Sequence, residues 1–182
     1  MNQTSDLTER TLSREEKYQG GFLSLHVDQV QLPNGRTSIR EVVEHVDGVA
    51  ILALDDRNNV LTVTQYRYVF GRPLLEIPAG KLEPGEDPVS GALRELKEET
   101  GAVPDTFLPM GVVLPSPGCL GERLHLFLAR GLHMEKQHLD EDEFLNVERI
   151  PFSEMVHRVM DGEIEDGKTI AAVLKAKVLL DL

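Results

Sequence analysis

The chain has 182 residues, 41% of them hydrophobic and 27% charged, a composition that fits an ordinary globular protein and excludes disordered and fibrous classes. The formal net charge is −12 and no basic stripe is present, which disfavours nucleic acid polymers and anionic membranes as partners. Because the N-terminus is polar, no apolar run could span a bilayer and the single cysteine cannot form an internal disulfide, we expect a cytoplasmic protein.

Two β-hairpins are predicted in the first half of the chain. Residues 22–32 alternate apolar and polar side chains, meet the turn sequence Pro33-Asn34-Gly35, and are followed by an apolar segment at 39–43. Residues 49–54 form a continuous apolar run closed by a polar turn, and residues 60–66 have the composition of its partner strand.

The second half is predicted to contain three helices and three further strands. Asp87 is a helix N-cap followed by proline, and apolar residues then recur at helical spacing until Gly101. Further strands are predicted at 108–114, 124–129 and 147–150, and further helices from Ser153 to about Met160 and over 169–180. This order predicts an α/β (α+β) fold in which a mixed β-sheet is sandwiched between α-helices.

The central helix carries a cluster of carboxylates. With Glu95 as the reference, Glu98 lies at about −60° and Glu99 at about +40° around the helix axis, so the three share one face. Like charges at this spacing are unfavourable without a cation, and carboxylate oxygens select Mg²⁺, Mn²⁺ or Ca²⁺. Gly91 lies on the same face, where we expect its missing side chain to leave room for ions and substrate. Taken alone, the carboxylate pattern of this helix is explained better by a solvated acidic face than by a metal site.

The loop before this helix changes that interpretation. The segment GKLEPGEDPVSGALRELKEETGA, residues 80–102, has Gly80, five residues, Glu86, seven residues and then the run from Arg94 to Gly101. This pattern resembles the Nudix box and matches it at every fixed position. Only Ala102 departs, since the family usually carries a larger aliphatic residue there.

The resemblance implies the Nudix fold and the hydrolysis of nucleoside diphosphates linked to another moiety, with Mg²⁺ as cofactor and Mn²⁺ as a substitute. Matching positions make Glu95 and Glu99 the principal metal ligands and Glu98 a ligand or a close neighbour. In the branch that cleaves ADP-ribose and nucleoside diphosphate sugars, a backbone carbonyl before the box also binds metal, and here that residue is Ala79.

Other segments resemble the same branch. These are the sequence at 75–80, Pro117 sixteen residues beyond Gly101, and Gln65-Tyr66-Arg67, although Ser116-Pro117-Gly118 is also an ordinary turn. The resemblance implies that Arg67 holds the diphosphate. The remaining candidate contacts are Arg40, Glu41 and Glu76 for the nucleoside portion, and Glu122 for the substrate or for a residue that holds the metal ligands.

The acidic run at 140–143 by itself indicates a solvated loop. In the resembled branch, a glutamate on a mobile loop at this point activates the attacking water. The resemblance therefore makes Glu143 the candidate general base, with Glu141 as the alternate. Metals would neutralise the diphosphate and acidify the water, while the glutamate accepts its proton.

The resemblance also predicts domain organisation and partners. Residues 1–45 are expected to form an N-terminal antiparallel β extension that serves as a dimerisation element, and residues 46–182 the Nudix hydrolase domain. We expect a homodimer acting on a small-molecule nucleotide sugar, and the sequence does not choose among ADP-ribose, GDP-mannose and other nucleotide sugars. The alternatives are a nucleoside triphosphate pyrophosphohydrolase of the same superfamily and a catalytically silent Nudix module that senses a ligand.

A competing motif occurs at residues 162–169, which formally match the P-loop pattern. A P-loop follows a buried strand, whereas residues 152–160 are predicted to be helical. Glu163, Glu165 and Asp166 would also oppose bound phosphates. We therefore reject a P-loop for this chain.

Overall fold

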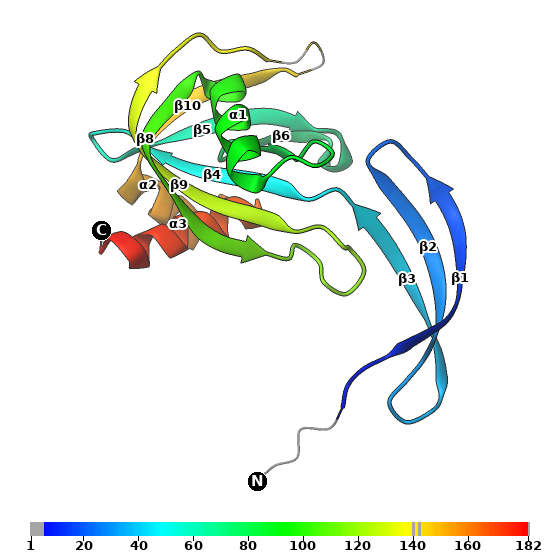
Figure 1. The fold of residues 1–182 in the computed structure, drawn as a ribbon. Helices are drawn as coiled ribbons and strands as arrows, with labels where there is room; N and C mark the ends of the chain where they lie inside the picture. The colour runs from blue at the N-terminus through cyan, green and yellow to red at the C-terminus, as the bar shows by residue number, and fades with distance from the viewer. Residues whose placement is uncertain (1–5, 140, 142, 182) are drawn as a thin grey trace. The chain divides into compact units, whose positions relative to one another are not determined.

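The computed structural model describes residues 6–139, 141 and 143–181, and the chain divides into two compact units. One unit comprises Met1–Val46 with Ser116–Glu122, and the other comprises Asp47–Pro115 with Arg123–Leu182. Each is described by itself (Figure 1). In the part of the chain that the structure describes, no helix is long and apolar enough to cross a membrane.

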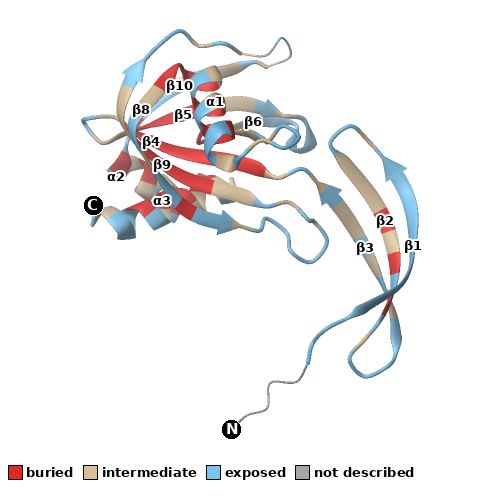
Figure 2. Ribbon diagram, viewed as in Figure 1, coloured by how far each residue is buried: buried red, intermediate tan, exposed pale blue. Residues whose placement is uncertain are grey.

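The N-terminal unit is a three-stranded antiparallel sheet of β1 (Arg10–Gln19), β2 (Leu23–Gln31) and β3 (Thr37–His45). The predicted hairpin of β2 and β3 is confirmed, and residue 25 pairs with residue 43 in its register. β1 was not predicted, because every residue in it is exposed and no apolar alternation marks it (Figure 2).

The second unit contains a seven-stranded mixed sheet. Its path runs β10-β5-β4-β9-β8, with β4 parallel to β9 and the other neighbours antiparallel. The additional strand β6 pairs with β5, and β7 pairs with β4. The bounds are β4 (Gly48–Leu54), β5 (Asn59–Arg67), β6 (Arg72–Glu76), β7 (Ala79–Lys81), β8 (Ala102–Val113), β9 (Leu124–Met134) and β10 (Leu145–Pro151), with a 3₁₀ turn at Tyr68–Phe70.

β4 and β5 form the predicted second hairpin only near their turn. They pair at Ala53 with Leu61 and at Leu54 with Val60, and further along the two strands take different partners. There β6 lies beside β5 and β7 beside β4, while the Ile51 N–H donates to the Pro78 carbonyl at 2.8 Å. β4 and β5 therefore separate beyond these pairs, and the segment that precedes the Nudix box crosses the sheet from β5 to β4.

The helices cover both faces of this sheet, as predicted. α1 (Pro88–Thr100) packs on the face that carries Val49 and Ile51, whereas α2 (Phe152–Met160) and α3 (Gly167–Leu180) pack on the face that carries Leu52 and Leu54. Figure 1 shows α1 on one side of this sheet and α2 and α3 on the other. The fully apolar run of β4 is therefore buried on both sides.

Local signals placed the ends of α1 correctly. The Asp87 carboxylate accepts the N–H groups of Val89 at 3.0 Å and Ser90 at 3.2 Å, and the helix ends at Gly101 with φ of 74°. Ser153 is not the cap of α2, which begins at Phe152 after Pro151.

Other element bounds also differ from those predicted, and three of them are informative. α3 begins two residues early, because the Asp166 side chain accepts the Thr169 N–H at 3.0 Å and caps it. β8 begins six residues early, since a strand at the sheet edge tolerates its prolines, and β9 continues to Met134.

Candidate active site

Two of the three predicted metal ligands on α1 are buried. Glu99 is 1% exposed and accepts the Ala79 N–H at 2.9 Å, and Glu95 is 8% exposed. Burial raises the pKa of Glu99 to about 8, with further contributions from the charges of Glu95 and Glu143. Burial also raises the pKa of Glu95, again with Glu143 contributing. Without a cation, the Glu99 carboxyl therefore favours its protonated form at neutral pH.

Arg94 holds the carboxylates beside it. Its Nη1 donates to Glu95 at 2.9 Å and to Glu98 at 3.0 Å, while Nε and Nη2 donate to Glu86 at 2.9 Å each. The guanidinium lowers the pKa of Glu86 to about 2. Through Glu86, Arg94 thereby links the loop that precedes α1, here called the box loop, to the acidic face of α1.

The carboxylates of α1 are the candidate donors for a metal ion. Among residues 6–139, 141 and 143–181, no group of three or more His, Cys, Asp or Glu side chains is placed to hold a metal ion. The donors nevertheless suit a hard divalent cation, because Glu95, Glu98 and Glu99 lie within two turns of one helix and two of them are buried. Arg94 contacts Oε1 of Glu95 and Oε2 of Glu98 but not the second oxygen of either carboxylate.

Two glycines fit the packing around these carboxylates. A Cβ on Gly80 would overlap the Glu95 carboxylate, so this glycine lets β7 pass directly beneath that side chain. The expectation for Gly91 was wrong. A Cβ there would overlap Leu82 and lie 2.9 Å from Oε2 of Glu86, so Gly91 admits the box loop rather than ions or substrate.

We expect Gly80→Ala to displace the Glu95 carboxylate and weaken metal-dependent activity by about 10-fold or more, since a shift of about 1 Å at a site can have that effect. The metal concentration that gives half-maximal activity should rise. Gly21→Ala is the matched control, because its Cβ would meet nothing within 4 Å. Unchanged metal dependence in a folded Gly80→Ala protein would contradict this role for Gly80.

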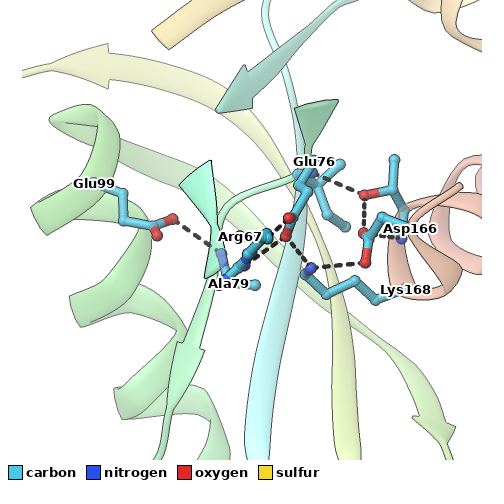
Figure 3. A network of polar contacts seen from close by, with 8 residues as sticks. Arg67, Glu76, Ala79, Glu99, Asp166 and Lys168 are labelled. Carbon is cyan, nitrogen blue, oxygen red and sulfur yellow. Dashed lines mark hydrogen bonds and ion pairs between the residues drawn. The ribbon is translucent and has the colours of Figure 1, made fainter. Parts of the chain in front are cut away.

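Arg67, the predicted diphosphate contact, is paired with Glu76. Its Nε donates to Oε1 of Glu76 at 2.7 Å and its Nη2 to Oε2 at 2.6 Å, and Lys168 also donates to Oε2 (Figure 3). Lys168 further donates to Asp166 at 2.9 Å. The charge of Lys168 acts on Glu99 and that of Glu99 on Arg67, so this network and the acidic face of α1 lie within electrostatic reach.

Sequence reasoning missed Lys168 and its neighbours. The Thr169 hydroxyl donates to Asp166 at 2.5 Å and accepts the Ile77 N–H at 2.9 Å, which joins the start of α3 to the end of β6. The signal was the P-loop-like sequence, and its rejection as a P-loop agrees with the α2 helix that precedes it. Although it is not a P-loop, this motif contains Lys168 and Thr169, which are candidates for a functional role because they belong to this polar network.

Three candidate substrate residues belong to the N-terminal unit. Arg40 pairs with Glu9, with Nε donating at 2.9 Å, and Glu41 is exposed. Glu122 lies 3.7 Å from Nδ1 of His45. Each is described within that unit and remains a proposed contact.

The candidate bases lie in the loop before β10. Glu141 is exposed and Glu143 is half-buried, whereas positions 140 and 142 of the acidic run lie outside the described residues. The Glu143 charge contributes to the raised pKa of both Glu95 and Glu99. This proximity supports Glu143 over Glu141 as the candidate base.

Comparison with known proteins identifies the family. The NUDIX domain family matches residues 44–173, and the nucleoside diphosphate sugar hydrolase N-terminal domain matches residues 9–43. The chain therefore belongs to the Nudix hydrolase family, whose members generally use divalent metal ions. This confirms the resemblance of the box.

Three relatives cover most of the chain. ADP-ribose pyrophosphatase of Bacillus subtilis is 41% identical, over 92% of this chain and 91% of the relative. Methanol dehydrogenase activator of Bacillus methanolicus is 41% identical, over 91% and 90%. GDP-mannose pyrophosphatase of Yersinia enterocolitica is 36% identical, over 77% and 78%. A crystal structure of an ADP compounds hydrolase has a TM-score of 0.86, covers 98% of this chain and 97% of its own, and at 21% identity shows the shared fold.

Proposed function

We propose that this protein hydrolyses the diphosphate linkage of ADP-ribose and nucleoside diphosphate sugars with Mg²⁺, giving a nucleoside monophosphate and a sugar phosphate. The observation that carries the proposal is the meeting of three features in one unit. These are the buried carboxylates of α1, the glutamate of the loop before β10 whose charge acts on them, and the partly exposed guanidinium of Arg67. The names of the Bacillus subtilis and Yersinia relatives support the substrate class.

The proposed roles follow the chemistry of the side chains. Glu95, Glu98, Glu99 and the Ala79 carbonyl would hold the metal, which supplies positive charge for the diphosphate and acidifies the attacking water. Arg67 would bind the diphosphate through its exposed edge. Glu143 would take the proton of the attacking water, with Glu141 as the alternate.

We propose that the N-terminal unit is a dimerisation element. All of β1 is exposed, and its unit exposes several large hydrophobic side chains. These side chains are Leu7, Leu12, Tyr18, Phe22, Ile39 and Val46. A second copy would cover such a surface. In such a homodimer, Arg40, Glu41 and Glu122 are the proposed contacts to substrate.

A substrate panel tests the function. With Mg²⁺, the protein should cleave ADP-ribose and GDP-mannose at least 10-fold faster than ATP, as judged by chromatographic separation of the nucleoside monophosphate product. Faster cleavage of triphosphates would move the protein to the triphosphate-cleaving branch. Binding of ADP-ribose without turnover would identify a ligand sensor.

A further inference from the structure

Glu76 is a buried carboxylate shared by two cations. It is 1% exposed, Oε1 accepts from Nε of Arg67, and Oε2 accepts from both Nη2 of Arg67 and Nζ of Lys168. The Lys168 side chain is itself 10% exposed. Because both oxygens are engaged and away from solvent, Glu76 suits the organisation of its neighbours better than contact with a nucleoside (Figure 3).

Arg67 differs from the other members of this group in its accessibility. Its side chain is 36% exposed, and Glu76 engages only Nε and Nη2. Among the contacts described for residues 6–139, 141 and 143–181, Nη1 has no acceptor. One edge of the guanidinium is therefore fixed and the other is available to an anion, in the planar geometry that suits phosphate oxygens.

The charge balance explains why a second cation matters. An isolated pair of Arg67 and Glu76 would cancel, leaving little positive potential at the exposed edge. Lys168 supplies another positive charge on the buried side of Glu76. Its second acceptor, Asp166, caps α3, where the positive end of the helix dipole offsets part of the carboxylate charge.

We propose that Lys168 is a positioning residue for substrate binding. Through Glu76 it holds the Arg67 guanidinium in place and preserves the positive charge of its exposed edge for the diphosphate of the substrate. This inference rests on the proposed function, because the diphosphate is that of the proposed substrate. It also changes the predicted role of Glu76 from a nucleoside contact to a bridge between the two cations.

The test measures affinity for a non-hydrolysable ADP-ribose analogue with a methylene group in the diphosphate, by titration calorimetry with Mg²⁺. Lys168→Gln keeps a hydrogen-bond donor and removes the charge, and it should weaken binding about 10-fold. Lys168→Arg keeps the charge and should bind within about 3-fold of wild type. Lys175→Gln is the control, since Lys175 is exposed on the same helix, and it should leave affinity unchanged.

A double-mutant cycle separates positioning from a general effect on folding. In an Arg67→Ala background, Lys168→Gln should weaken binding by less than about 2-fold, because the residue through which it acts is gone. An equal loss in both backgrounds would overturn the proposal, as would wild-type affinity in a folded Lys168→Gln protein. A wild-type protein that does not bind the analogue would overturn it too.

Turnover of ADP-ribose, measured alongside, keeps the two claims distinct. Binding of the analogue without turnover of ADP-ribose refutes the proposed hydrolysis, while the cycle still decides the role of Lys168. In an active protein, Lys168→Gln should raise KM about 10-fold and change kcat by less than about 3-fold, since the Arg67 contact exists before and during the reaction.

Discussion

Glu99→Gln should reduce Mg²⁺-dependent turnover by at least about 100-fold and make the metal-free protein more stable at pH 8. The loss of turnover follows from the removal of a charged oxygen donor from the proposed metal site. The gain in stability follows from burial, because the pKa of the 1% exposed carboxyl is raised to about 8, so the unfolded chain releases this proton at a lower pH than the folded protein does.

The sign of the pH effect is fixed by the raised pKa. Between about pH 4.5 and pH 8, the folded metal-free protein binds a proton at Glu99 that the unfolded chain has lost, so this group makes stability fall as pH rises. The contribution at pH 8 is about 4 kcal/mol in order of magnitude, at about 1.4 kcal/mol for each pH unit between 4.5 and about 8. Glutamine does not titrate and escapes this loss.

Urea unfolding in the presence of a chelator, at pH 5 and pH 8, measures the effect. The difference between Glu99→Gln and wild type should be small at pH 5 and large at pH 8. Glu163→Gln, at an exposed position, should show no such divergence. Metal-dependent turnover at the wild-type rate in Glu99→Gln would contradict its assignment as a ligand.

Glu143→Gln should lower kcat by about 10²–10⁴-fold, because that is the usual contribution of a general base. The affinity for the metal should change little. The amide matches the carboxylate in shape and cannot accept the proton. The choice of Glu143 is supported by its effect on the pKa of Glu95 and Glu99. The loss should persist across the pH range in which wild type is active.

Glu141→Gln is the matched control on the same loop, where Glu141 is exposed. It should retain activity within about 3-fold of wild type. A large loss in Glu141→Gln together with a near-normal rate in Glu143→Gln would transfer the role of base to Glu141.

The elements that were predictable from sequence are those specified by local signals. Asp87, Pro88 and Gly101 define α1 because cap and turn chemistry act over a few residues. β1 escaped prediction because its side chains are exposed on both faces, and β7 because three residues are too few for a periodic pattern. The parallel pairing of β4 with β9 depends on packing across the whole chain.

The residues of the candidate site also fall into those that local sequence signals predicted and those that they did not. The α1 carboxylates were readable from spacing, since they lie on consecutive turns of one helix. The contact of Lys168 with Glu76 joins positions 92 residues apart and depends on how α3 meets β6, so no local pattern predicted it. The pairing of Arg94 with Glu86, which lies in the loop before α1, likewise became visible only in three dimensions.

The most direct test of the central claim is phosphorus NMR of ADP-ribose incubated with the purified protein and Mg²⁺. The diphosphate resonances should be replaced by two phosphomonoester resonances, those of AMP and ribose 5-phosphate, and a parallel sample with chelator should remain unchanged. Persistence of the diphosphate resonances in the Mg²⁺ sample, under conditions in which the protein is folded, would contradict the proposed hydrolysis.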